Sequence, residues 1–245
     1  MSPDATLIDT RSVRKQDRVR GGLYGRRKGK TLRPHQARLI EELLPRLCVD
    51  LTTECDVSAL FQQAVTDIWL EIGFGGGEHL IRSAAENPDI GFIGCEPFVN
   101  GIAKALSAIE TLGLTNIRLY AGNAADLIGW LPSSSLGCVL GRVFLFFPDP
   151  WPKRRQRKRR FVSDENLATL AQVMRSGAEL RFATDIDDYA GWTLARILRS
   201  PDFVWPTDQS ADWTRPWEGW RETRYEKKAR EVGRRAVYLT FRASR

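Results

Sequence analysis

From residue 67 onward, short apolar stretches alternate with segments of helical periodicity, and this alternation constrains the fold more than any other feature of the chain. We expect strands at residues 68–72, 91–95, 116–120, 138–147, 179–183 and 237–241. We expect helices at about 78–86, 100–112, 124–131 and 189–199. Repeated strand–helix units build a doubly wound, mostly parallel α/β sheet, and ligands bind such sheets at the carboxyl ends of the strands.

The residues before this core divide into two parts. Residues 1–33 are polar, basic and rich in glycine, which predicts a flexible N-terminal arm. Four leucines recur at helical spacing after Pro34 and predict an amphipathic helix over about 34–47. Because no repeat or low-complexity linker follows, we interpret residues 34–245 as a single domain.

Positive charge is concentrated in two segments of the chain. Residues 11–33 hold ten Lys and Arg against one acid, and residues 153–160 hold seven bases and no acid. Since these segments carry 16 net positive charges and the whole chain carries 7, the remaining residues sum to −9. A solvated face or a disordered arm explains a single basic segment. Two such segments beside a catalytic core favour a polyanionic partner, whose counterions are released on binding.

Composition argues against a membrane protein, a secreted protein and a metal site. The most apolar stretch, 139–147, contains Arg142 and is shorter than the ~20 residues of a spanning helix. The N-terminal residues have no basic patch followed by an apolar run, so we expect a cytoplasmic protein. The four cysteines are scattered and only two histidines are present, which favours reduced thiols and no metal.

A glycine cluster follows the first expected strand. Gly73, Gly75 and Gly77 lie where this strand turns into a helix, and residues without Cβ allow a ligand to approach the backbone there. A packing turn is the ordinary alternative. The dinucleotide fingerprint would have a third glycine where Glu78 stands. A nearby carboxylate, Glu71, instead suits S-adenosylmethionine, which carries an ammonium group and a sulfonium but no phosphate.

Polar side chains also follow the next two strands. Glu96 comes 19 residues after Gly77, and a carboxylate at this spacing accepts hydrogen bonds from the ribose hydroxyls of a nucleoside. A surface acid at a strand end is the alternative for Glu96 alone. Asn123 follows the third strand, where its amide would meet the edge of an adenine. The sequence therefore predicts a nucleoside-containing cofactor at this edge of the sheet.

The segment Pro148-Asp149-Pro150-Trp151 follows the fourth expected strand, where an acceptor would meet a transferable group. Two prolines fix the backbone around one carboxylate and remove competing N–H donors. A base would stack on Trp151, as in single-strand binding proteins. Lys153 and the basic segment follow at once, which favours a nucleic acid over a small-molecule substrate.

Five motifs in this order resemble the bacterial tRNA (guanine-N7)-methyltransferase family, over about residues 25–241. They are LEIGFGGG at 70–77, GCEP at 94–97, FFPDPWPK at 146–153, ATD at 183–185 and TRYE at 223–226. The third and fifth are specific to the family, whereas the first two are common among methyltransferases. The resemblance implies a Rossmann-like class I fold that uses S-adenosylmethionine to methylate guanine 46 in the tRNA variable loop.

The resemblance also assigns roles to individual residues. It implies cofactor binding by Glu71, Glu96, Asn123 and Asp149, with Asp149 as the active-site residue. It implies substrate binding by Lys153, Asp185, Thr223, Arg224, Tyr225 and Glu226. Without it, we would interpret Asp185 as a helix N-cap and residues 223–226 as a charged connector. Many relatives carry Asp in place of Asn123 and His in place of Pro152.

The chemistry of the acceptor agrees with this assignment. Guanine N7 has a free lone pair, so its methylation needs no proton removed and no histidine. We expect Asp149 to orient the base or to stabilise the cation that forms.

Two other functions fit the same sequence features. None of the three functions requires a protein partner. Methyltransferases of exocyclic amino groups carry D/N-P-P-aromatic at this strand end, which Asp149-Pro150-Trp151 nearly matches. An RNA-binding module that has lost its cofactor would keep the same fold.

Overall fold

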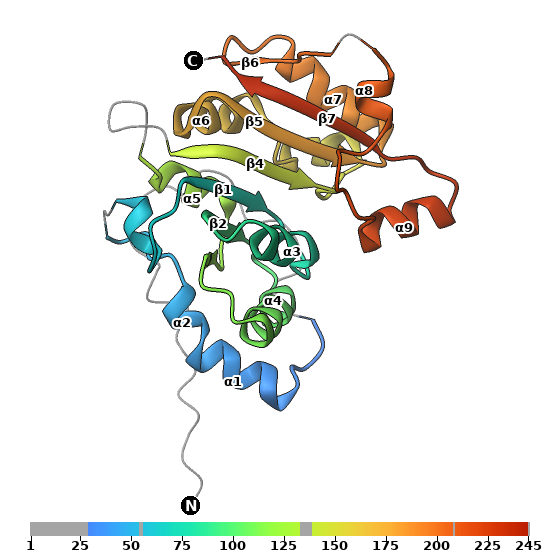
Figure 1. Ribbon diagram of the computed structural model, residues 1–245. Helices are drawn as coiled ribbons and strands as arrows, with labels where there is room; N and C mark the ends of the chain where they lie inside the picture. The colour runs from blue at the N-terminus through green and yellow to red at the C-terminus, as the bar shows by residue number, and fades with distance from the viewer. Residues whose placement is uncertain (1–28, 54–55, 133–138, 208, 245) are drawn as a thin grey trace, which may run out of the picture.

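Seven strands form one sheet in the part of the chain that the computed structural model describes, residues 29–53, 56–132, 139–207 and 209–244 (Figure 1). The strands are β1 (Asp67–Ile72), β2 (Ile90–Cys95), β3 (Ile117–Tyr120), β4 (Leu140–Phe146), β5 (Met174–Thr184), β6 (Phe203–Val204) and β7 (Val237–Ala243). Their order in the sheet is β3-β2-β1-β4-β5-β7-β6. The expected doubly wound, mostly parallel sheet is confirmed.

The strand pairing aligns the carboxyl ends of the central strands. Strands β1 to β5 pair in parallel, and Ile72 at the end of β1 lies opposite Cys95 of β2 and Leu145 of β4. The last strand, β7, runs antiparallel to β5 on one side and to β6 on the other. The turns that follow β1, β2, β3 and β4 therefore meet at one edge of the sheet.

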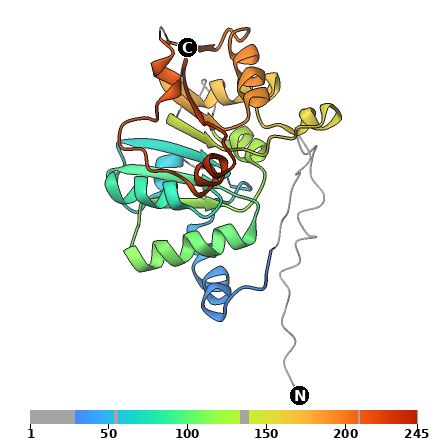
Figure 2. The same ribbon diagram turned by 90° about the vertical axis from the view of Figure 1, so that its right-hand side faces the viewer.

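Helices cover both faces of the sheet (Figures 1 and 2). They are α1 (Pro34–Glu42), α2 (Leu44–Leu47), α3 (Glu78–Glu86), α4 (Val99–Leu112), α5 (Ala124–Trp130), α6 (Asp164–Val173), α7 (Asp187–Ile197), α8 (Ala211–Thr214) and α9 (Arg224–Glu231), with 3₁₀ turns η1 (Val57–Leu60) and η2 (Arg154–Arg159). Apolar side chains of α1, α3 and α4 form one core cluster, and those of α5, α6 and α7 form another.

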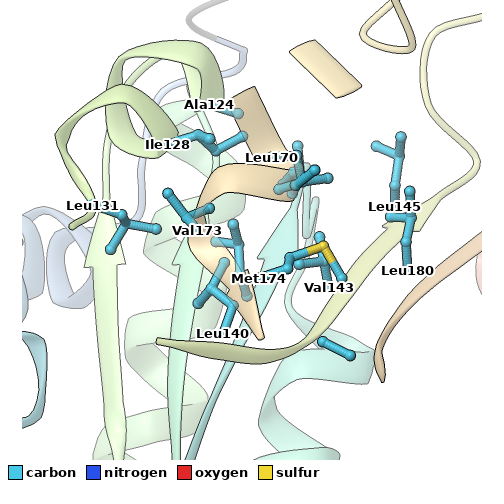
Figure 3. Close-up of a cluster of buried hydrophobic side chains, with 14 of the residues drawn as sticks. Ala124, Ile128, Leu131, Leu140, Val143, Leu145, Leu170, Val173, Met174 and Leu180 are labelled. Carbon is cyan, nitrogen blue, oxygen red and sulfur yellow. The ribbon is translucent and has the colours of Figure 1, made fainter. Parts of the chain in front are cut away.

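Alternation along each strand divides its side chains between the two clusters. In β4, Val143 and Leu145 face α5 and α6, whereas Phe144 and Phe146 face α3. Figure 3 shows part of the cluster beneath α5 and α6, with Leu170 of α6 among the buried side chains. Such burial on both faces explains why the sequence of β4 is almost continuously apolar.

The expected helix over 34–47 is wrong in one respect, because it is two helices. Pro45 has no N–H to donate to the carbonyl of Glu41, so the first helix ends at Glu42. Strand β5 is also longer than expected, since it begins at Met174 directly after α6. Helices α6, α8 and α9 and strand β6 were not predicted from the sequence.

Two further expectations concern the ends and the environment of the chain. Most of the expected flexible arm, 1–33, lies outside the described residues and stays a prediction. No helix in the described ranges is long and apolar enough to cross a bilayer.

Candidate active site

A cavity of about 570 Å³ lies at the carboxyl edge of the sheet. Figure 2 looks onto this edge, with α9 in front of the sheet. The turns after β1 to β4 contribute to its wall, together with η2 and the first residues of α6 and α9. The predicted residues in this wall are Gly73, Gly75, Glu96, Asn123, Asp149, Arg224 and Tyr225. The structure therefore brings together seven side chains or glycines that the sequence places up to 152 positions apart.

The glycine loop between β1 and α3 depends on left-handed backbone conformations. Gly73 and Gly75 have φ angles of 71° and 58°, which side chains with a Cβ rarely adopt. The close approach of α4 adds a second constraint, because a Cβ on Gly101 would lie 2.1 Å from the carbonyl oxygen of Gly75. Gly77 does not line the cavity and instead packs against Ala105 of α4.

Glu96 fixes the glycine loop from the end of β2. Its carboxylate accepts hydrogen bonds from the backbone N–H groups of Gly75, at 2.7 Å, and Phe98, at 2.9 Å. Burial raises the pKa of Glu96, and the nearby charge of Asp149 raises it further, although both N–H donors oppose this shift. The carboxylate thus orders the loop that forms the cavity wall and also faces the cavity itself.

Asn123 stands at the N-terminus of α5. Its side-chain oxygen accepts a hydrogen bond from the backbone N–H of Ala125 at 3.2 Å, so it caps the helix. The residue also lines the cavity, between the end of β3 and the start of α5. An aspartate would cap the helix equally well, so the amide is not required by the fold.

The turn after β4 carries Asp149 in an unusual backbone. Phe147 and Trp151 are the non-glycine residues with positive φ in the described part of the chain, at 48° and 43°. They flank the Pro148-Asp149-Pro150 segment on both sides. Asp149 lines the cavity while exposed to solvent, and the surrounding protein removes enough water to raise the pKa of its carboxyl.

Trp151 also lines the cavity and has a cationic neighbour. The guanidinium of Arg159 lies 4.9 Å from the centroid of the indole ring. A base that stacks on Trp151 would therefore come close to the positive charge of Arg159.

Glu71 lies outside the cavity wall. In β1 it shares a face with Trp69, so its side chain points toward α3, and its carboxylate lies 2.8 Å from Nδ1 of His79. The His79 ring in turn packs against Phe144, Phe146 and Trp220. Its predicted contact with a cofactor stays a prediction. The signal for this orientation in the sequence is strand alternation, which places Glu71 on the same face as Trp69 and opposite to Leu70 and Ile72.

Residues 223–226 begin helix α9 with a capping box. Thr223 Oγ1 accepts from the backbone N–H of Glu226 at 3.1 Å, and the Glu226 carboxylate accepts from the backbone N–H of Thr223 at 3.4 Å. The same carboxylate accepts hydrogen bonds from Trp220 and Tyr238. The interpretation of this segment as a charged connector is thus wrong.

The cap directs its two central residues toward the cavity. Arg224 and Tyr225 line the wall beside the glycine loop, and a Cβ on Gly75 would lie 3.0 Å from a terminal nitrogen of Arg224. Thr223 and Glu226 themselves lie outside the wall, where their hydrogen bonds hold α9.

Two predicted substrate residues lie away from the cavity wall. Lys153 is exposed at the start of η2. Asp185 forms an ion pair with Arg234 at 2.9 Å. It does not cap α7, whose N-cap is Ile186, so the helix-cap alternative is wrong. Substrate contacts by Lys153 and Asp185 stay predictions.

The basic segment 153–160 is not a uniform surface. Lys153, Arg154, Arg155 and Lys158 are exposed. Arg157 instead forms an ion pair with Asp188, and Arg160 is buried. Four of its seven bases are therefore free to meet phosphates, and the sequence alone did not separate them from the rest.

The described residues contain no group of three or more His, Cys, Asp or Glu that would hold a metal ion. Cys48 and Cys95 are free thiols.

The sheet order and the cavity at its carboxyl edge are those of a Rossmann-like fold. A family described as putative methyltransferase matches residues 51–239, so the chain belongs to this class of protein. Among solved structures, TrmN from Thermus thermophilus has a TM-score of 0.51 at 13% identity, covering 76% of this chain and 46% of that one. The [4+2]-cyclase SpnF has a TM-score of 0.50 at 15% identity, covering 77% and 78%. Both likenesses concern the fold alone, and the cyclase illustrates that this fold does not fix an activity.

Other proteins share a much higher sequence identity with this chain than these two solved structures do. A chain from Rhodopseudomonas palustris (strain BisA53) is 51% identical, covering 97% of this chain and 94% of that one. One from Rhodopseudomonas palustris (strain BisB18) is 54% identical, covering 89% and 86%. One from Brucella abortus (strain 2308) is 50% identical, covering 91% and 95%. All three are named tRNA (guanine-N(7)-)-methyltransferase, and this chain belongs to the family that they form.

Proposed function

We propose that this protein transfers a methyl group from S-adenosylmethionine to N7 of guanine 46 in the variable loop of tRNA. Besides family membership, the composition of the cavity wall supports this proposal. The cavity joins a glycine loop and Glu96 on one side to Asp149 and Trp151 on the other, with exposed bases at its border. This arrangement supports a cofactor site, an acceptor site and a phosphate-binding surface that adjoin one another.

The residues present fit S-adenosylmethionine. A cavity of about 570 Å³ lies within the range of about 300–1,000 Å³ that holds small ligands. Left-handed Gly73 and Gly75 leave backbone free of side chains, and Glu96 presents carboxylate oxygens for ribose hydroxyls. Asn123 would meet the adenine. When bound, the cofactor supplies a methyl group on a positively charged sulfur.

The acceptor chemistry makes few demands on the protein. The N7 lone pair forms the new bond to carbon as the bond from sulfur breaks, and no proton is removed. Catalysis then requires positioning of the base and a counter-charge for the purine cation. Asp149 supplies a carboxylate in the cavity, and Trp151 supplies a ring for the base to stack on.

The substrate is a polyanion, which suits the charge around the cavity. The exposed bases Lys153, Arg154, Arg155 and Lys158 follow directly on the Asp149 turn. Phosphate contacts there would orient the RNA so that one base reaches Trp151. With tRNA as substrate, we expect the protein to act in the cytoplasm, and no protein partner is required.

Methyl transfer from labelled S-adenosylmethionine to an unmodified tRNA transcript tests this function. We expect one N7-methylguanine, mapped to position 46, and no product when that guanine is replaced by adenine. N6-methyladenine would support the exocyclic-amino alternative. Absence of cofactor binding by calorimetry would support the non-catalytic RNA-binding alternative.

The role of Asp149 is tested in a single turnover. Asp149→Ala is expected to slow methylation about 100-fold or more, because the base loses an anchor and its cation loses a counter-charge. Asp187→Ala, which removes an exposed acid outside the cavity wall, is the matched control. A near-normal rate for Asp149→Ala would falsify this role.

A further inference from the structure

Arg160 differs from every other base of the segment 153–160. Its side chain is 0% exposed, whereas four of its neighbours face solvent. A buried guanidinium requires partners for its five N–H donors. Its contacts therefore indicate what the residue does.

These contacts join the Asp149 turn to helix α7. Arg160 donates from Nε to the carbonyl oxygen of Pro150 at 2.7 Å, and its terminal nitrogens donate to the backbone and the carboxylate of Asp188. The guanidinium also lies over the rings of Tyr189 and Trp192, at 4.7 and 5.1 Å from their centroids. Both its charge and its planar shape are used.

The turn needs support at the position that Arg160 contacts. Pro150 comes directly before Trp151, whose positive φ is unfavourable for a residue with a bulky side chain. Such a conformation persists only where the surrounding structure imposes it. At the other end of the turn, Phe147 has the same property and donates its N–H to Ala183 of β5 at 2.8 Å. A hydrogen bond of Phe147 itself therefore holds one strained position. A hydrogen bond to Pro150, the residue before Trp151, holds the other.

We propose that Arg160 is a positioning residue, which holds the Pro150 carbonyl and so fixes Asp149 and Trp151 at the cavity. Asp188 is the second half of this clamp, since its carboxylate orients the guanidinium from the start of α7. The inference rests on the proposed methyl transfer and adds a residue that acts through the turn without touching the substrate.

The electrostatics of Asp188 agree with a formed clamp. The hydrogen bond from Arg160 is the main cause of the lowered pKa of Asp188, with smaller effects from the charges of Arg160 and Arg157. Because Arg160 is fully buried, it has no surface left to contact a phosphate. The clamp therefore predicts an effect on rate without an effect on the salt dependence of RNA binding.

Arg160→Lys tests the clamp. Lysine keeps the charge near Asp188, but its donors all lie on one nitrogen, which cannot contact both Pro150 and Asp188 in the geometry of the guanidinium. We expect kcat to fall about 10- to 100-fold, as for small misplacements of reacting groups. The KM for tRNA should change less than about threefold, and the slope of log Kd for tRNA against log salt should stay as in the wild type.

Two further variants make the result specific. Arg155→Ala removes an exposed base of the same segment and should raise KM and reduce the salt slope. Asp188→Asn changes an exposed side chain and keeps its shape, so it also serves if Arg160→Lys does not fold. It should slow kcat in the same way, and the double variant should be no slower than the slower single variant.

The kinetic results distinguish a positioning role for Arg160 from phosphate binding and from a general loss of stability. A wild-type kcat in both Arg160→Lys and Asp188→Asn, or a reduced salt slope with unchanged kcat in Arg160→Lys, overturns the clamp. So does an equal loss of kcat in Phe241→Ala, a variant of a buried residue outside the cavity wall, assayed at the same margin below its melting temperature. An inactive wild-type protein would contradict the methyl transfer itself, whereas an active wild type with unaffected variants contradicts only the clamp.

Discussion

At the scale of single residues, Glu96 and Asp149 both line the cavity and are held in different ways. Glu96 is buried and accepts two backbone hydrogen bonds, whereas Asp149 stands on a strained turn in contact with solvent. Removal of water raises the pKa of both, and the charge of Asp149 adds to the shift of Glu96. Glu96 thus orders the glycine loop, whereas Asp149 stands in the cavity wall in contact with solvent.

These raised pKa values predict a loss of cofactor binding in mild acid. A carboxyl with a raised pKa takes up its proton at a higher pH than a free glutamate, which titrates near 4.3. Protonated Glu96 loses an acceptor for ribose hydroxyls, so affinity measured by calorimetry should decline while the pH is still above that value. Glu96→Gln should bind weakly at neutral pH and show a flatter pH dependence.

The accompanying change in stability has the opposite sign. A carboxyl whose pKa is higher in the folded state than in the unfolded state binds protons more tightly when folded. Its ionised form therefore costs stability at neutral pH, and this cost decreases as the pH falls through the folded pKa. Unfolding at the same pH at which binding declines, followed by circular dichroism, would contradict Glu96 as the cause.

At the scale of elements, helix α9 contributes to the site although it is only eight residues long. A helix of this length is marginal by itself. Its capping box and the hydrogen bonds of Glu226 to Trp220 and Tyr238 attach it to the sheet. Within the motif at 223–226, Thr223 and Glu226 therefore cap the helix. Arg224 and Tyr225 line the cavity.

We predict that Thr223→Ala destabilises α9 by about 1 kcal/mol through loss of the cap. Faster amide hydrogen exchange over residues 226–231 should report the loss, together with a higher KM, because Arg224 and Tyr225 lose their fixed place. Thr223→Ser keeps the hydroxyl and should restore both. Glu231→Ala, at the other end of α9, is the control, and an equal effect there would argue against the cap.

At the scale of the whole molecule, β7 connects the parallel strands of the sheet to the edge strand β6. It pairs with β5 and β6 and buries Tyr238, Leu239 and Phe241 in the two core clusters. The strand thereby links the cluster beneath α5, α6 and α7 to the aromatic cluster around Trp217 and Trp220. Stability of the site and of the sheet should consequently be lost together.

Phe241→Ala tests this. The side chain is 0% exposed, so its truncation should lower the free energy of unfolding by about 3–5 kcal/mol in urea denaturation. Arg242→Ala changes the next, exposed residue on the opposite face and should cost less than about 0.5 kcal/mol. Similar losses for the two variants would contradict the packing of β7.

The sequence by itself determined the strand–helix alternation of the core, the glycine loop, the Asp149 turn and the segregation of charge. Each of these features depends on a short stretch of sequence, because hydrophobic periodicity, glycine and proline determine the conformation of only a few neighbouring residues. That is why Gly73, Gly75, Glu96, Asn123 and Asp149 were found before the fold was known. The same reasoning missed α6, which has ten residues, and the shorter elements α8, α9 and β6.

Only the tertiary structure decided where side chains point and which distant segments meet. Glu71 faces His79 rather than the cavity because β1 presents alternate residues to opposite faces of the sheet. Arg160 is buried while Arg155 is exposed, although both stand in one basic segment. Burial depends on which helix packs alongside, and α7 begins 27 residues further on. Local composition specifies what a residue can do, and packing selects which of those functions it performs.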